Sequence, residues 1–235
     1  MKSDFFKSNT YFLDEKSRNS FLGNPLFSYV STYQIYDEQG DYIGVVKPNE
    51  KRVKRNKMWK WFFTWDSLPL IWEIRNSDDK IEAFISRGFY SFGKFTVKDP
   101  QGAIIGEIKQ KLSFRQIKYI LRESFWIILD ASKVLISEIF SEESCTTFRM
   151  NDAYNNQLGL ISLNLNWSGS GEMKGGFTAT YKYKLHIEDD YSNSTNKLLL
   201  LSFMVCHDEL VFKGDRDLLI SRVTRLREKS KLIIE

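Results

Sequence analysis

The sequence predicts a mainly β protein, in which repeated strand–turn–strand units form one domain closed around a single apolar helix. Three observations predict it. Aromatic residues make up 15% of the 235 residues, and rings fit the half-buried surface of a pleated sheet. A hairpin pattern recurs along the chain. Residues 197–212 are apolar on nearly every face of a helix.

The hairpin pattern joins an alternating strand, an Asp-x-x-Gly type of turn and a strand with an apolar–Gly pair. Its clearest copies begin at residues 33, 95 and 148. Aspartate at the first turn position accepts a backbone hydrogen bond, and glycine, or Asn156, tolerates positive φ at the last. Looser copies turn at residues 78–79 and 130–133. These five hairpins give about ten strands, and one further pair is predicted at residues 176–180 and 183–187.

Ordinary hairpins also build a β-sandwich, so closure needs its own argument. A helix that is apolar on every face must be surrounded by protein. A closed barrel supplies that surround and leaves no strand edge exposed. The helix at residues 197–212 therefore favours a barrel, with Thr195 or Asn196 as its expected N-cap.

These residues resemble the phospholipid scramblase family, within the tubby C-terminal-like group that also includes the LURP-one-related proteins. The resemblance covers roughly residues 9–213. It rests on the hairpin repeats, on Trp167-Ser168-Gly169 followed by Gly176-Phe177-Thr178, and on the helix. The helix positions that match are Lys197, Leu200, Leu201, Asp208 and Phe212. The resemblance implies a closed antiparallel barrel of about twelve strands around a buried C-terminal helix, and a role at phospholipid surfaces.

The expected organisation is one barrel domain at residues 1–214 and a basic amphipathic tail at residues 215–235. Two distant cysteines, Cys145 and Cys206, form no metal-like pair and fit a reducing compartment. The N-terminus has no signal-peptide pattern, and the longest apolar stretch is shorter than the roughly 20 residues of a membrane span. We therefore expect a cytoplasmic protein, peripheral to membranes where it meets them.

A basic and aromatic segment is the main functional candidate. Its cations are Lys47, Lys51, Arg52, Lys54, Arg55, Lys57 and Lys60, and its indole rings are Trp59, Trp61 and Trp65. Cations near an anionic lipid surface gain about 1 kcal/mol each, and Trp favours the headgroup boundary. The segment thus predicts a lipid-docking loop. The alternative is a solvated connection whose aromatic residues fill the barrel wall.

The tail repeats this theme, with Leu219, Val223 and Leu226 along one helical face. Its cations include Arg216, Arg222, Arg225, Arg227 and Lys229. A basic amphipathic helix lies on a membrane or, equally compatible with the pattern, caps the open end of the barrel.

Other polar residues give weaker candidates. Asp189 and Asp190 stand before the helix, where the resemblance places a calcium loop, although calcium prefers six to eight oxygen ligands. We otherwise expect no cofactor. His207 and Asp208, near the helix end, are expected to satisfy backbone or strand groups at the barrel mouth. No nucleophile elbow, phosphate loop or Cys/His dyad is visible, which indicates a protein that is not an enzyme.

The expected partner is an anionic phospholipid surface, with lipid scrambling as the activity that the resemblance implies. Moving a headgroup across about 30 Å of hydrocarbon requires a polar path, which the sequence does not reveal. The alternative function is a soluble module that binds a protein or a ligand, and a hydrolase is the third. The net charge of +4 is too small to indicate nucleic acid.

Overall fold

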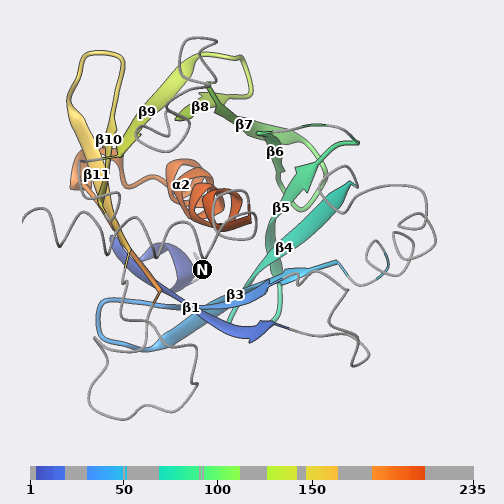
Figure 1. The fold of residues 1–235 in the computed structure, drawn as a ribbon. Helices are drawn as coiled ribbons and strands as arrows, with labels where there is room; N and C mark the ends of the chain where they lie inside the picture. Colours follow the sequence, from blue (N-terminus) through green and yellow to red (C-terminus); the bar gives the residue numbers. More distant parts are fainter. Residues whose placement is uncertain are drawn as a thin grey trace, which may run out of the picture.

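A computed structural model describes residues 4–18, 31–49, 51, 69–89, 91, 93–111, 126–141, 147–163 and 182–209. These residues form a closed barrel of twelve antiparallel strands with one α-helix inside it (Figure 1). The fold class predicted from the sequence, a mainly β closed barrel around a C-terminal helix, is therefore confirmed.

The strands are β1 (Thr10–Arg18), β2 (Ser31–Tyr36), β3 (Tyr42–Pro48), β4 (Leu70–Asn76), β5 (Ile81–Arg87), β6 (Lys94–Lys98), β7 (Ile104–Gln110), β8 (Trp126–Asp130), β9 (Leu135–Ser141), β10 (Thr147–Asn151), β11 (Gln157–Leu163) and β12 (Tyr183–Ile187). The helical elements are η1 (Asp4–Phe6), η5 (Asp189–Tyr191) and α2 (Ser194–His207). Each strand pairs with the next, and β1 closes the barrel against β12.

Strand β1 was not predicted, and it corrects the last predicted hairpin. β12 pairs with β11 on one side and with β1 on the other, so residues 183–187 do not form the hairpin expected with residues 176–180. Residues 176–180 lie outside the described part of the chain. β1 was missed because the buried charged residues Asp14 and Glu15 interrupt the alternation of apolar and polar residues that marks a strand. Its partner β12 is also distant in sequence.

Five hairpins share one turn, which explains the sequence repeat. In each, the side chain of the first turn residue accepts a hydrogen bond from the backbone N–H four residues on; these first residues are Asp37, Asn76, Asp99, Asp130 and Asp152. The fourth residue has positive φ; these residues are Gly40, Asp79, Gly102, Lys133 and Asn155. One detail of the prediction was wrong, since Asn155 and not Asn156 takes the positive φ. The looser turn predicted at residues 78–79 lies there, and its first residue is Asn76.

The same repeat lines the barrel in layers. Counting from the first turn residue, the position four before is a buried aromatic in every hairpin: Tyr33, Trp72, Phe95, Trp126 and Phe148. The position seven after it is a small residue: Gly44, Ala83, Gly106, Ser137 and Gly159. Small residues let the helix approach the wall closely, since a Cβ built on Gly106 would lie 2.6 Å from Leu199 Cδ2. The missing side chain of Gly106 therefore makes room for α2, whereas a Cβ on Gly44 would meet Phe5 and one on Gly159 would meet Met150.

Helix α2 fills the barrel. Every residue from Lys197 to His207 is buried, as expected for a helix apolar on all sides. The Asn193 side chain accepts a hydrogen bond from the Asn196 backbone N–H at 2.9 Å, so the N-cap is Asn193 and the predicted caps Thr195 and Asn196 were wrong. α2 spans Ser194–His207 and a π-helical turn continues to Glu209, while residues 210–212 of the predicted helix lie outside the described residues. In the described part of the chain, no helix combines the length and apolar character needed to cross a bilayer.

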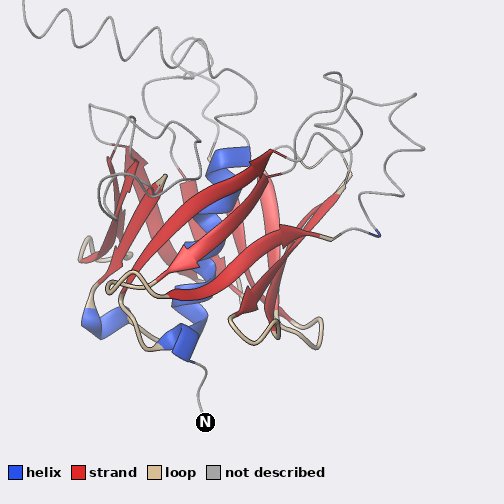
Figure 2. Cartoon of the chain, turned by 90° about the horizontal axis from the view of Figure 1, so that it is seen from below, coloured by secondary structure: helices blue, strands red, loops and turns tan. Residues whose placement is uncertain are grey.

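The barrel has two different ends. The five hairpin turns, η1 and η5 gather at one end, where α2 begins (Figure 2). We call this the turn end. At the opposite end, where α2 finishes, β3 ends and β4 begins, and β7 ends and β8 begins (Figure 2). The longer connections join the strands at this end. We call it the connection end.

Candidate functional site

The turn end is acidic. The carboxylates of its five turns and of the β12–α2 connection are Asp37, Glu38, Asp41, Asp78, Asp79, Asp99, Asp130, Asp152, Glu188, Asp189 and Asp190. The cations in these segments are Lys80 and Lys133. Part of this acidity follows from folding, since the first turn residue must offer a side-chain oxygen to close the turn. Exposed apolar side chains at this end, including Val134 and Tyr154, stand among these carboxylates.

The connection end receives the basic segments of the sequence. Lysine and arginine outnumber aspartate and glutamate in residues 50–68, 112–125 and 210–235, which follow or join elements that finish at this end. Lys51 is described and exposed. The other predicted docking residues lie outside the described residues; they are Arg52, Lys54, Arg55, Lys57, Lys60, Trp59, Trp61 and Trp65. The turn end is thus acidic in the described residues, whereas three of the chain segments that adjoin the connection end are basic in sequence, and their structure lies outside the described residues.

Lys47 differs from the other predicted docking residues. Its Nζ lies 3.2 Å from Asp79 Oδ1, and Arg75 Nη1 lies 3.2 Å from the other oxygen of that carboxylate. Asp79 belongs to the β4–β5 turn, so the Lys47 ammonium points toward the acidic turn end. Hydrogen bonding from Lys47 is the main cause of the lowered pKa of Asp79. Lys47 is therefore engaged with Asp79 on the barrel wall.

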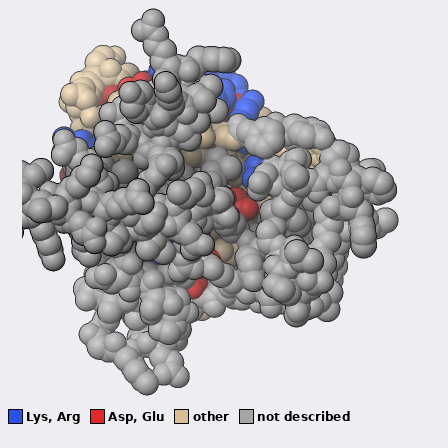
Figure 3. Space-filling model, in the orientation of Figure 1, with Lys and Arg blue, Asp and Glu red and all other residues tan. Residues whose placement is uncertain are grey.

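A lysine cluster on the outer wall was not predicted. The Glu107 carboxylate lies 2.8 Å from Lys109 Nζ and 3.6 Å from Lys94 Nζ, and it also accepts a hydrogen bond from Lys133. We call these four residues the Glu107 cluster. In the space-filling view, Lys and Arg side chains gather over β6 and β7 (Figure 3). No sequence motif marked the cluster, because its members come from β6, β7 and the β8–β9 turn and meet only when the strands pair.

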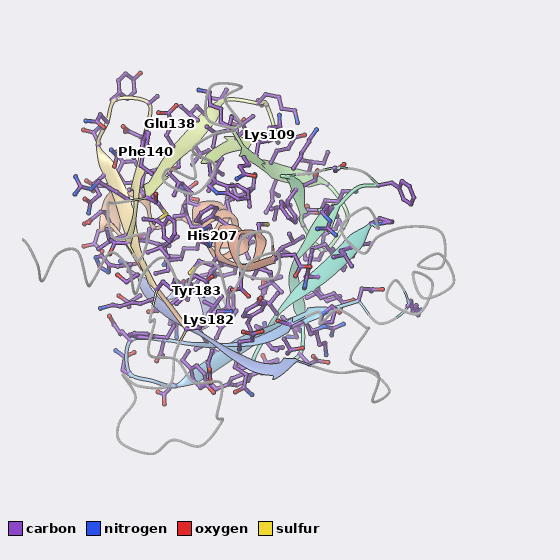
Figure 4. The ribbon with its side chains drawn as sticks, viewed as in Figure 1. Lys109, Glu138, Phe140, Lys182, Tyr183 and His207 are labelled. Atoms are coloured by element: carbon purple, nitrogen blue, oxygen red, sulfur yellow. The ribbon has the colours of Figure 1, made fainter. Side chains whose placement is uncertain are left out.

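The C-terminal end of α2 carries a buried polar network. Asp208 follows the helix and is 1% exposed. Its carboxylate lies 2.5 Å from Lys182 Nζ and accepts hydrogen bonds from Tyr183, at 2.9 Å, and from Tyr33. Lys182 also lies 2.8 Å from Glu15 Oε2. Figure 4 shows Lys182 and Tyr183 approaching the helix from β12, with His207 at the barrel centre. This network, which we call the Asp208 network, ties the helix end to β1, β2 and β12.

His207 lies among rings just before that network. Its ring centroid is 4.5 Å from Phe148 and 6.3 Å from Trp126. Burial lowers the pKa of His207 to about 4, although the Asp208 carboxylate opposes the shift. Burial, followed by the charge of Asp208, raises the pKa of Tyr33 and of Tyr183. At neutral pH the imidazole is uncharged and both phenols keep the protons that they donate to Asp208.

The two predicted calcium ligands, Asp189 and Asp190, have no further ligands grouped with them in the described residues. Asp189 and Asp190 are exposed on η5, and the Asp189 carboxylate accepts a hydrogen bond from the Asn9 side chain. Across the described ranges, no three His, Cys, Asp or Glu side chains are grouped to hold a metal ion. The structure therefore adds no ligand to the predicted pair.

Comparison of the chain with family models, curated proteins and solved structures gives no match. The resemblance to the phospholipid scramblase family thus stays a prediction, as does the expectation that the chain is not an enzyme. The class that the fold defines is a closed twelve-stranded barrel filled by a helix.

Proposed function

We propose that this barrel binds anionic phospholipid headgroups and docks on membrane surfaces with its connection end. The observation that carries the proposal is the acidity of the turn end, set against the basic sequence of chain segments that adjoin the opposite end. Acidic turns occupy one end, and the chain segments rich in lysine and arginine begin or join strands at the other. An anionic surface attracts the connection end and repels the turn end, so the charge distribution selects one orientation.

The distances make this selection effective. A seven-residue strand such as β3 is about 23 Å long, and barrel strands tilt by about 40°, which leaves roughly 18 Å along the axis. The Debye length at physiological ionic strength is about 8 Å. When the connection end touches the membrane, the carboxylates at the turn end are about two Debye lengths away and oppose binding little. Each cation at the surface contributes about 1 kcal/mol.

An aromatic side chain at the same end adds an apolar anchor. Phe89, in the short connection between β5 and β6, is 44% exposed. Aromatic side chains of peripheral proteins enter the boundary between headgroups and acyl chains. Phe89 thus adds an exposed ring at the connection end to the predicted rings Trp59, Trp61 and Trp65, which lie outside the described residues. The resemblance to the scramblase family points in the same direction.

Vesicle co-sedimentation tests the proposal. We expect the protein to bind vesicles of phosphatidylcholine and phosphatidylserine, to bind pure phosphatidylcholine weakly, and to lose affinity as salt rises. The variant Lys51→Glu/Arg52→Glu should bind anionic vesicles at least tenfold more weakly, because two attractive charges become repulsive.

The matched control is Lys7→Glu/Lys80→Glu, which changes the net charge equally but at the turn end, where both lysines are exposed. It should bind nearly as well as the wild type. Equal losses in the two variants would show that net charge alone governs binding, and absence of binding by the wild type would refute the proposal.

A protein-binding role is the second candidate, and the turn end favours it. Val134 is 62% exposed and Tyr154 is 86% exposed among acidic turns. Apolar side chains rimmed by charge are typical of protein interaction sites. If the wild-type protein does not bind anionic vesicles, the protein-binding role becomes the stronger candidate. Pull-down experiments with the variant Val134→Ser/Tyr154→Ser then test it.

A further inference from the structure

The Glu107 cluster has the features of a small anion-binding site on the outer wall. The Glu107 side chain is 7% exposed, whereas those of Lys94 and Lys133 are 50% and 51% exposed. Lys109, labelled on β7 in Figure 4, is intermediate at 32%. One buried carboxylate thus holds three ammonium groups, of which two are half open to solvent.

Glu107 acts as the fixed base of this cluster. Burial by itself raises the pKa of Glu107, but hydrogen bonds from Lys109 and Lys133 outweigh it and lower that pKa to about 2. The carboxylate is therefore ionised at physiological pH. An ammonium group has three N–H donors, so each lysine that gives one to Glu107 keeps two for an outer ligand.

The charge of the cluster indicates which ligand it fits. Three ammonium groups against one carboxylate leave two unbalanced positive charges. A phosphate monoester carries about −1.5 to −2 at neutral pH, whereas a phosphodiester carries a single negative charge. Lysine binds phosphate as a point charge, so charge balance favours the monoester.

We propose that Lys94, Lys109 and Lys133 form a binding site for a phosphate monoester dianion, with Glu107 holding the three ammonium groups in place. The monoester belongs either to a soluble phosphorylated molecule or to a lipid headgroup with a terminal phosphate. The site stands apart from the docking proposal, because it is built from described side chains on the barrel wall and is tested without vesicles.

Titration of the isotopically labelled protein with glycerol 3-phosphate, followed by NMR of the lysine side chains, is the first test. Dimethyl phosphate at the same ionic strength is the diester comparison. We expect the monoester to bind at least tenfold more tightly and to shift the lysine signals of the cluster. The variant Lys94→Gln/Lys133→Gln should weaken monoester binding by about fivefold for each lysine removed. Equal affinity for the two phosphates, or an unchanged variant, would overturn the proposal.

Two isosteric variants separate a built site from general attraction. Glu107→Gln and Glu138→Gln each raise the net charge by one, and Glu138 lies on β9 opposite Ile127, on the same wall (Figure 4). If only net charge mattered, both variants would strengthen phosphate binding equally. We expect Glu107→Gln to weaken it severalfold, because the lysines lose their base, and Glu138→Gln to leave it unchanged or slightly stronger. Thermal melting checks that both variants fold.

Vesicles then distinguish the two sources of the monoester. At matched surface charge, preference for phosphatidic acid over phosphatidylserine that is lost in Lys94→Gln/Lys133→Gln supports a lipid source. Binding of glycerol 3-phosphate without that preference supports a soluble one. Failure to bind phosphatidylserine vesicles would refute docking while leaving the monoester titration intact.

Discussion

The Lys182 ammonium lies 2.5 Å from the Asp208 carboxylate, where the end of α2 meets the start of β12. This contact answers a problem posed by the helix itself. A helix that is apolar on every side finds similar surroundings at many rotations and heights within an apolar barrel. A buried polar contact with defined partners favours one of them, which is the best-supported role of buried charges in protein interiors. At the other end, Lys197 Nζ donates to the Phe6 carbonyl at 2.7 Å, so both ends of the helix are fixed.

The Asp208 network predicts a large and non-additive effect of mutation. Lys182→Met removes the ammonium between Glu15 and Asp208 and leaves two buried carboxylates without their shared counter-charge. We expect the free energy of unfolding to fall by about 3 kcal/mol. Adding Asp208→Asn should restore part of that loss, because the remaining carboxylate is then less repelled. Urea denaturation of both single variants and the double variant measures the coupling, and simple additivity would contradict the network.

His207 predicts an acid-dependent loss of stability. Its pKa is about 4 in the folded protein against an ordinary value of 6.5. Between these values the unfolded chain binds the proton and the folded protein does not, so stability decreases as pH falls from about 6.5 and the loss is complete below about 4. The full effect is about 3 kcal/mol.

The control for that prediction is His207→Phe, which keeps a ring among the neighbouring rings but does not titrate. Its urea midpoint should change less between pH 7 and pH 4 than that of the wild type. Identical pH profiles for the two proteins would show that His207 does not cause the loss.

Gly106, which faces α2, is predicted to resist enlargement. A Cβ at position 106 would lie 2.5 Å from the Leu129 carbonyl oxygen and 2.6 Å from Leu199 Cδ2, and the carbonyl is fixed by strand pairing. We expect Gly106→Ala to cost about 2 kcal/mol of stability. Gly102→Ala is the comparison, since its Cβ meets nothing within 4 Å but its φ is +90°, a cost of about 1 kcal/mol. Chemical denaturation should rank them in this order, and the reverse order would contradict the close packing of α2 against β7.

The hairpins were predictable because their signals are local. Asp37 and Gly40 sit in the same turn, and the chemistry of a turn is visible in four or five consecutive residues. The extent of apolar sequence likewise predicted a buried helix. Strand β1 was not predictable in this way, because its buried Glu15 is paired with Lys182, which lies far along the chain.

The candidate sites divide along the same line. The basic segment after Lys51 was found because its residues are consecutive, and it lies outside the described residues apart from Lys51 itself. The Glu107 cluster was missed because strand pairing alone assembles it. Lys47 was assigned to the basic segment by position, but β-sheet geometry directs its side chain toward Asp79. The sequence did not show this contact, because Asp79 meets Lys47 only when β3 pairs with β4; the docking role of Lys47 stays a prediction.

The orientation of the barrel on an anionic vesicle tests the central claim most directly. Ser91 lies at the connection end and Ser132 is exposed in the β8–β9 turn. The nearly isosteric substitutions Ser91→Cys and Ser132→Cys therefore give labelling sites at opposite ends of the barrel. The background is Cys145→Ser, and the remaining Cys206 is buried. With nitroxide labels and phosphatidylserine vesicles, electron paramagnetic resonance accessibility should show the label at position 91 passing from water to the lipid boundary, while the label at position 132 stays in water. Lipid contact at position 132, or at neither position on bound protein, would contradict docking by the connection end.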